Sequence, residues 1–192
     1  WRKRLYTGPA SFERLSPNVL VLDKCIGGLK GQAPYGEAEV WMVQEKLREA
    51  LSLRPIYYNG LPQRYNWINR PSQSGEAFLC FSFSSEQAFS NVKVAVERLE
   101  NYRVFLNGRS VDANIDGYYF DKSIKTALLP PLQKGENVLR LEFTLKNSTE
   151  LENIYLIGDF GVSPGRVLVE EPKTLFSGDY TGQGYFHYAG DM

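Results

Sequence analysis

The chain has 192 residues, of which 43% are apolar and 14% aromatic, enough for a substantial core in one domain or one domain with extensions. Lysine and arginine number 22 together, and aspartate and glutamate also number 22, so the formal net charge is zero. A zero net charge gives no electrostatic basis for binding nucleic acid or an acidic membrane, and neither is a predicted partner. It is compatible with neutral polyhydroxylated ligands.

The composition is that of a turn-rich chain. Its 17 glycines and 10 prolines are spread along the sequence, as in folds built from short strands. We expect residues 1–17 to continue from a preceding domain, residues 18–170 to form a β-sandwich domain, and residues 171–192 to lead into or close a sandwich. Because residue 1 is tryptophan rather than methionine, the chain is expected to be a fragment or a processed product.

Residues 37–53 contain the one predicted helix. Apolar residues recur there at spacings of three and four, which places them on one stripe. The stripe, which includes Trp41 and Leu47, is predicted to pack into the core. Glu37 and Glu39 suit the positive N-terminal end of such a helix.

Short strands fill most of the remaining chain. Alternating apolar and polar residues predict half-buried strands at 91–99 and 138–145, and residues 77–83 are apolar on both faces, which suits a central strand. Residues 121–128 are predicted to form a short irregular or helical crossing that begins with Asp121 as a cap. The other predicted strands are residues 18–25, 102–106, 110–113, 116–120, 153–162 and 167–169.

The strands that flank Asn107-Gly108 predict a β-hairpin. This dipeptide favours a type I′ turn, in which both central residues need positive φ. A second turn, Lys134-Gly135-Glu136-Asn137, leads into the strand at 138–145. The pattern of short strands with one helix predicts an all-β fold, an antiparallel β-sandwich of the jelly-roll type with one short amphipathic helix.

These turns also carry a family resemblance. The hairpin at Phe105-Leu106-Asn107-Gly108, the strand entry at residues 134–139 and the crossing at residues 121–124 resemble the galactose-binding-like jelly-roll domains of large bacterial glycoside hydrolases, such as the sugar-binding domain of the family 2 glycosidases. Residues 152–162 and 183–190 are similar to segments of α-L-rhamnosidase-like chains. The resemblance implies a bacterial accessory module. The matching positions are structural and transfer no catalytic residue.

A long loop at residues 54–75 is the predicted ligand site, because loops of this length inside compact domains are often functional. Sugars are bound by exposed aromatic rings that stack on them and by polar side chains that bond their hydroxyls. The loop and an aromatic pair at residues 118–119 supply both. The alternative is that these rings pack the loop onto the sandwich. The predicted carbohydrate-binding residues are Trp67, Tyr65, Arg64, Gln63, Tyr58 and Tyr118.

No catalytic or metal site is predicted. The acids beside strand ends, such as Asp116 and Asp121, fit turns and caps, and the sequence singles out no carboxylate pair of the kind that glycoside hydrolysis needs. His187 is the one histidine, and no nucleophile elbow accompanies it. One histidine and two separated cysteines exclude an ordinary zinc site. A jelly roll can bind calcium through carbonyls and carboxylates, but the sequence has no D-x-D-x-D-type loop, and neither a metal nor another cofactor is predicted.

The cysteines leave the compartment undecided. Cys25 and Cys80 both lie in apolar, strand-like runs, which is typical of buried free thiols, and a disulfide between them stays open. No run approaches the roughly 18 apolar residues of a membrane span, and no signal peptide is visible. Secreted and cytoplasmic localisation both stay open.

Three functions are compatible with these patterns. The leading one is a non-catalytic β-sandwich module of a larger glycoside hydrolase, which supports the catalytic domain, contacts other domains of the same chain and has carbohydrate as a further partner. The second is an autonomous carbohydrate-binding or adhesion module. The third is a glycosidase that acts through a carboxylate pair.

Overall fold

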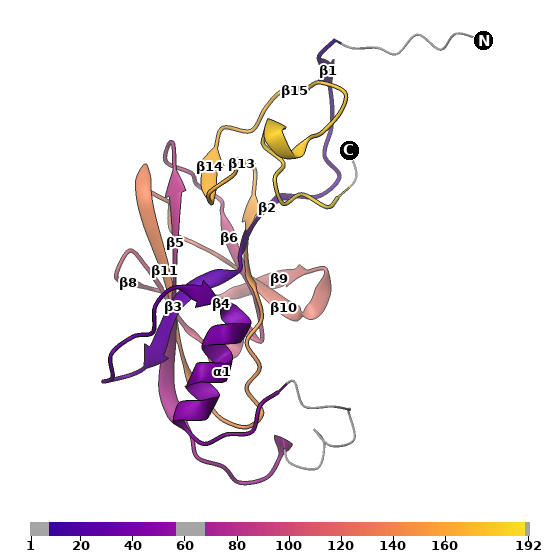
Figure 1. Cartoon of the computed structure of the whole chain (residues 1–192). Coiled ribbons are helices and arrows are strands. Elements are labelled where there is room, and N and C mark those ends of the chain that lie inside the picture. Colours follow the sequence, from indigo (N-terminus) through magenta and orange to yellow (C-terminus); the bar gives the residue numbers. More distant parts are fainter. Residues whose placement is uncertain (1–7, 57–67, 191–192) are drawn as a thin grey trace, which may run out of the picture.

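Two β-sheets pack around one apolar core and form the body of the protein (Figure 1). The computed structural model describes residues 8–56 and 68–190. The five-stranded sheet has the order β2 (Asn18–Leu22), β12 (Ile154–Gly158), β6 (Lys93–Glu97), β10 (Asp121–Leu128) and β9 (Ile115–Tyr119). The larger sheet has the order β13 (Gly161–Ser163), β14 (Val167–Val169), β5 (Gly75–Ser85), β11 (Gly135–Leu145), β7 (Arg103–Leu106) and β8 (Arg109–Val111).

The predicted all-β, mostly antiparallel class is confirmed. The central pair of the larger sheet is β5 with β11, which are antiparallel and in register from Ser85 opposite Gly135 to Gly75 opposite Leu145. β3 (Lys24–Leu29) pairs with the other edge of β5 and with the short strand β4 (Ala38–Glu39). The one parallel pairing among the described strands joins β14 to β5.

Alternating side chains of the two sheets meet in the core, as the period-2 patterns predict. Val94 and Val96 of β6 and Leu139 and Leu141 of β11 are all at most 1% exposed. Each such side chain contributes roughly 1.5–3 kcal/mol by leaving water. Val138, an apolar residue at the start of this predicted strand, points outward: it is 37% exposed and precedes the inward-facing Leu139.

The hairpin between β7 and β8 has the predicted turn. Asn107 and Gly108 have φ values of +51° and +78°, so both central residues are in the left-handed region that type I′ requires. Asn107 Oδ1 accepts the backbone N–H of Val138 at 2.8 Å, and Asn107 Nδ2 donates to Asn137 Oδ1 at 3.0 Å. The buried Asn137 is bonded in turn to the backbone of Gln133. The two turns that carried the resemblance therefore form one bonded unit.

The prediction of a helical or irregular crossing at residues 121–128 is wrong, since these residues form β10. β10 pairs with β6 on one side and with β9 on the other, so backbone pairing on both edges decides its structure. Asp121 does act as a local cap. Its Oδ1 accepts both the backbone N–H and the hydroxyl of Ser123 at 2.7 Å, which closes a turn rather than a helix.

The single predicted helix is present as α1 (Val40–Ala50) and packs beside β3 (Figure 1). It begins later than predicted because Ala38–Glu39 pairs with β3 as β4. Glu39 makes no side-chain cap bond. Among the described residues, no helix is long and apolar enough to cross a membrane.

The predicted core stripe of α1 is only partly correct. Leu47 is fully buried, but Trp41 is 44% exposed, and the polar side chains of Gln44 and Arg48 are buried in its place. The reason is hydrogen bonding. Gln44 Oε1 accepts the backbone N–H of Leu151, and the Arg48 guanidinium donates to backbone carbonyls of the loops on both sides of it. A periodicity based on apolar residues does not detect a helix face whose buried side chains bond backbone groups of other segments.

The two cysteines are free thiols. In the pairing of β3 with β5, Ile26 lies opposite Cys80, so Cys25 is one residue out of register and points to the other face of the sheet. Opposed side-chain directions do not allow disulfide geometry. Cys25 is fully buried, and this burial raises its pKa to about 12, with the nearby Cys80 as a smaller cause.

Candidate functional site

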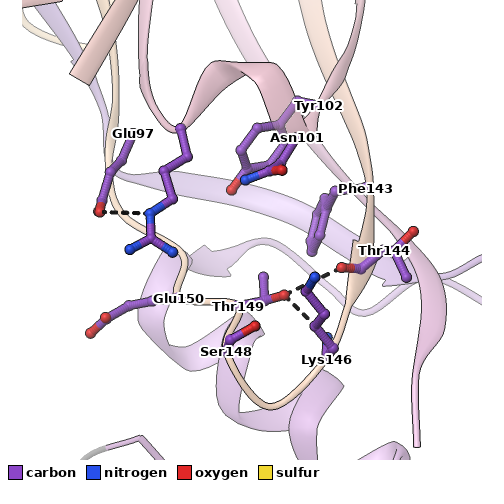
Figure 2. A pocket seen from close by; sticks show the side chains of 10 residues that line it. Glu97, Asn101, Tyr102, Phe143, Thr144, Lys146, Ser148, Thr149 and Glu150 are labelled. Carbon is purple, nitrogen blue, oxygen red and sulfur yellow. Dashed lines mark hydrogen bonds and ion pairs between the residues drawn. The ribbon is translucent and has the colours of Figure 1, made fainter. Parts of the chain in front are cut away.

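A pocket of about 260 Å³ lies at one end of the sandwich, where two connections cross between the sheets (Figure 2). The first connection leads from β6 through the short 3-10 helix η1 (Leu99–Asn101) to β7, and the second leads from β11 to β12. Each connection joins a strand of one sheet to a strand of the other. The pocket is therefore framed by backbone that both sheets hold in place.

Two aromatic rings form the apolar part of the pocket. The ring centroids of Tyr102 and Phe143 are 5.3 Å apart and the rings are tilted by 56°. Phe143 is 4% exposed, whereas Tyr102 is half-buried at the pocket wall. Burial raises the pKa of Tyr102, and the nearby Glu97 raises it further. Its hydroxyl is protonated at neutral pH, as in any ordinary tyrosine, and can donate a hydrogen bond.

The rest of the lining is polar and balanced in charge. Glu97 and Glu150 are the acids, and Arg98 and Lys146 the bases. The hydroxyls and amide come from Asn101, Thr144, Ser148 and Thr149. The pocket thus places the half-buried ring of Tyr102 beside several hydroxyl, amide and oppositely charged groups.

The loop of the second connection is held from inside the protein. Thr149 Oγ1 accepts the backbone N–H of Lys146 at 3.1 Å and donates to the carbonyl of Thr144 at 3.3 Å. The guanidinium of Arg48, which is 1% exposed, donates to the carbonyls of Thr149 at 3.1 Å and Asn147 at 3.4 Å. The buried cation thereby fixes the loop that carries four of the ten residues lining the pocket.

Of the six residues predicted to bind carbohydrate, one, Tyr118, lies in the part of the chain that the structure describes. Trp67, Tyr65, Arg64, Gln63 and Tyr58 lie outside the described part of the chain. Tyr118 lies on β9, is 57% exposed and does not line the pocket.

The aromatic pair at residues 118–119 does not form one surface. Successive residues of a strand point to opposite faces, and the ring of Tyr119 packs at 5.7 Å from that of Tyr155 and at 4.4 Å from that of Phe120. Sugar binding by Tyr118 stays a prediction.

The pocket residues were not predicted from the sequence. Asn101 and Tyr102 precede one strand, and the polar run Asn147-Ser148-Thr149 separates two others, which is a turn signal. That signal predicts two loops. It does not predict that they lie side by side, because this depends on the pairing of β7 with β11.

The acids at strand ends have structural partners. The Asp116 carboxylate pairs with Lys93 at 2.9 Å and accepts the hydroxyl of Thr126 at 2.7 Å. Burial acts to raise the pKa of Asp116, but these two bonds outweigh it and lower the pKa. Among residues 8–56 and 68–190, no group of three or more His, Cys, Asp or Glu side chains could hold a metal ion.

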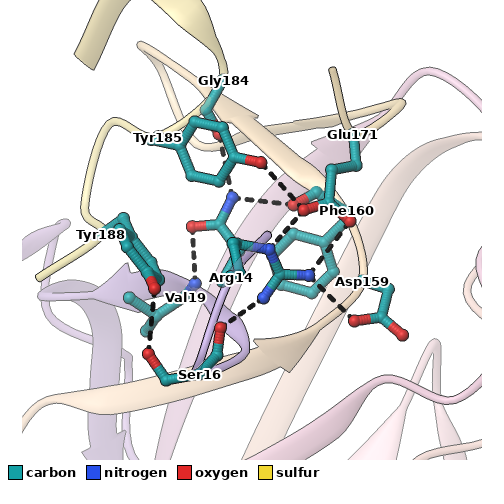
Figure 3. A network of polar contacts seen from close by, with 10 residues as sticks. Arg14, Ser16, Val19, Asp159, Phe160, Glu171, Gly184, Tyr185 and Tyr188 are labelled. Atoms are coloured by element: carbon teal, nitrogen blue, oxygen red, sulfur yellow. Dashed lines mark hydrogen bonds and ion pairs between the residues drawn. The ribbon is translucent and has the colours of Figure 1, made fainter. Parts of the chain in front are cut away.

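A second polar cluster joins the N-terminal and C-terminal segments (Figure 3). β1 (Ala10–Ser11) pairs with β15 (Thr174–Leu175), and the short 3-10 helix η2 (Thr181–Gln183) follows. The Arg14 side chain, 8% exposed, binds the Glu171 carboxylate and lies 2.9 Å from Asp159 Oδ1. Glu171 also accepts the hydroxyl of Tyr185 at 2.9 Å. The buried guanidinium is thus paired within the cluster, while the second carboxylate, that of Asp159, is 87% exposed to water, and we assign the cluster a structural role.

Comparisons with known proteins give limited matches. No protein-family profile and no curated protein matches the sequence. Among solved structures, a GH2 β-galacturonidase from Eisenbergiella tayi aligns over 77% of this chain and 26% of its own, with 14% identity and a TM-score of 0.37 in its glycerol-bound form, and with 12% identity in its galacturonate-bound form. A β-glucosidase from Kluyveromyces marxianus aligns over 69% of this chain and 16% of its own, with 10% identity and a TM-score of 0.35.

These three structures are glycoside hydrolases, and the chain spans about a quarter or less of their length. TM-scores of this size do not establish a shared fold.

Proposed function

We propose that the chain is a non-catalytic β-sandwich module of a larger glycoside hydrolase and that it binds carbohydrate in the pocket between the two inter-sheet connections. The observation that carries the binding proposal is the pocket itself, with the Tyr102 and Phe143 rings beside a charge-balanced polar rim. The glycoside-hydrolase context is supported by the resemblance of the two turns that Asn107 and Asn137 join.

The polar rim favours a neutral ligand. Two acids and two bases line the pocket, so it offers no net attraction to an anion or a cation. Sugar hydroxyls both donate and accept, so carboxylates, the lysine and the amide of Asn101 can all pair with them. A pocket of about 260 Å³ suits one sugar residue or the end of a chain rather than a long polymer.

The proposal is tested by titrating the chain with the neutral disaccharides cellobiose and lactose and following backbone amides by NMR. We expect shifts at Asn101, Tyr102 and the loop from Lys146 to Glu150. Asn101→Ala removes an exposed amide from the rim and should weaken binding about fivefold, the effect of one lost hydrogen bond. Asn114→Ala, an exposed asparagine outside the pocket, is the matched control.

Absence of amide shifts at the pocket with every neutral sugar tested would remove the binding part of the proposal. Turnover of an aryl glycoside by the isolated chain would contradict the non-catalytic part and favour the glycosidase alternative.

A further inference from the structure

One edge of the central strand β5 is shared by two strands that leave a gap between them. β3 pairs with the residues from Ala77 to Cys80, and β14 pairs with Ser84 and Ser85. Among the described residues, no strand pairs with residues 81–83 on this edge. The gap therefore lies beside β5, an inner strand of the larger sheet.

The backbone of Ser82 faces this gap. Ser84 donates its N–H to the carbonyl of Arg166 at 3.0 Å, and the Glu76 carbonyl accepts from Lys30 at 2.8 Å, so even-numbered residues of β5 direct their backbone groups to this edge. Backbone direction repeats every two residues along a strand, which places the N–H and carbonyl of Ser82 on the same edge. Both are strong hydrogen-bonding groups that need a partner.

A groove of about 560 Å³ opens over the gap. Its walls come from segments far apart in the sequence, namely the turn between β2 and β3, the loop before α1, the turn before β14, and the C-terminal tail. Ser82 and Ser84 line it from β5, and Glu136 lines it from β11. Phe186, 40% exposed, and His187 line it from the tail, with their rings in edge contact at 4.8 Å.

Arg166 is a preorganised donor in this groove. Its side chain is 18% exposed, and its Nη1 donates to Glu37 Oε1 at 3.0 Å and to the carbonyl of Lys24 at 3.4 Å. Arg166 has a φ of +62°, a left-handed conformation that costs a non-glycine residue about 1 kcal/mol or more. This conformation belongs to the turn that joins β13 to β14, in which Gly165 also has a positive φ of +83°.

We propose that this groove is a second carbohydrate subsite, separate from the pocket at the end of the sandwich, in which a neutral sugar bridges the gap in the sheet. Its hydroxyls bond the backbone of Ser82 and the carboxylate of Glu136, and its apolar face lies on the ring of Phe186. Three carboxylates, those of Asp23, Glu37 and Glu136, face two cations, Lys24 and Arg166, so the groove favours neutral sugars over uronates. The choice of ligand class rests on the proposed function, but the site does not depend on the pocket.

The test uses the full chain and follows backbone amides during titration with cellobiose, lactose and, as the charged probe, glucuronate. We expect the neutral disaccharides to shift the amide of Ser82 together with those of the Gly165-Arg166 turn and of Phe186. Phe186→Ala should weaken this response about fivefold, as expected for the loss of a stacking ring. Glu136→Gln, which keeps the side-chain shape but loses the charge, should weaken it less.

Phe176→Ala is the matched control, because Phe176 is an exposed aromatic residue of the same tail, 54% exposed, that does not line the groove. Thermal unfolding of each variant shows whether it folds as the wild type does. An unchanged response in a folded Phe186→Ala protein, or tighter binding of glucuronate than of cellobiose, would overturn the proposal.

The two sites report separately in the same spectra. Shifts confined to Asn101 and the 146–150 loop would overturn the groove proposal and leave the proposed function standing. Shifts confined to the groove would support the subsite and remove the pocket as the binding site.

Discussion

At the scale of single residues, His187 connects the C-terminal tail to a sheet edge. Its Nδ1 accepts the backbone N–H of Val21 at 3.3 Å, and Val21 belongs to β2, an edge strand of the five-stranded sheet. A ring nitrogen that accepts a hydrogen bond carries no proton, so the contact requires neutral histidine. Burial lowers the pKa of His187, and the negative charge of Asp23 opposes this shift without cancelling it.

The lowered pKa predicts a pH-dependent stability. Because the folded pKa is below the unfolded value of about 6.5, the stabilisation is fully present above that value and is lost as pH falls through the folded pKa. Loss of the hydrogen bond between Val21 and His187 should lower the free energy of unfolding by about 1 kcal/mol. Thermal unfolding between pH 5 and 8 should show a steeper acid loss for the wild type than for His187→Gln. Since His187 is the one histidine, equal slopes would contradict the assignment.

At the scale of elements, the position of α1 depends on a glycine in the neighbouring strand. A Cβ at Gly27 of β3 would overlap with Val43 Cγ1 of α1 and lie 3.1 Å from the carbonyl oxygen of Phe78. The absence of a side chain at Gly27 lets the helix approach the sheet closely. From sequence, the glycine pair at residues 27–28 predicts the end of a strand, but both residues lie inside β3, and Gly27 is the one that approaches the helix.

Gly27→Ala should therefore destabilise the protein by about 1–3 kcal/mol, the usual effect of overpacking a core. Gly36→Ala is the control, because a Cβ at Gly36 meets no atom within 4 Å and its φ is not in the left-handed region. Urea unfolding measures both. A loss of stability for Gly27→Ala no larger than that for Gly36→Ala would show that α1 has room to move away from β3.

Local patterns predicted the elements of this fold well, and partner-dependent features poorly. The Asn107-Gly108 turn was predictable because its φ values are set by the two residues themselves. β10 was mistaken for a crossing because pairing with β6 and β9, rather than its own sequence, makes it a strand. The pocket could not be predicted for the same reason, since Tyr102 and Lys146 come together through the pairing of β7 with β11.

At the scale of the whole molecule, Arg48 links the helix to the proposed sugar pocket. Its guanidinium donates to the carbonyls of Arg54, Asn147 and Thr149, so it joins the segment after α1 to the loop between the sheets. A buried cation without such acceptors would be costly, and carbonyls without the cation would lose their donors. Helix position and pocket shape are therefore coupled through one side chain.

Arg48→Met should lower the free energy of unfolding by about 2–4 kcal/mol, because several buried carbonyls lose a charged donor. In the fraction that folds, sugar-induced amide shifts at the 146–150 loop should also weaken. Arg103→Met is the control, since Arg103 is 59% exposed and its pairing with Glu142 at 2.9 Å is worth less than about 1 kcal/mol. Equal losses of stability in the two variants would contradict the role given to Arg48.

The divided edge of β5 also has a consequence for the order of folding. β3 precedes β5 in the chain, whereas β14 follows the whole β5–β11 pair and the crossing to β12 and β13. β14 therefore closes the larger loop, and loop-closure entropy makes such contacts slow to form. We expect β3, β5 and β11 to assemble first and β14 with the tail to dock last. The same segment can then open locally while the β5–β11 ladder stays intact. We therefore expect local unfolding of this sheet to begin at the groove.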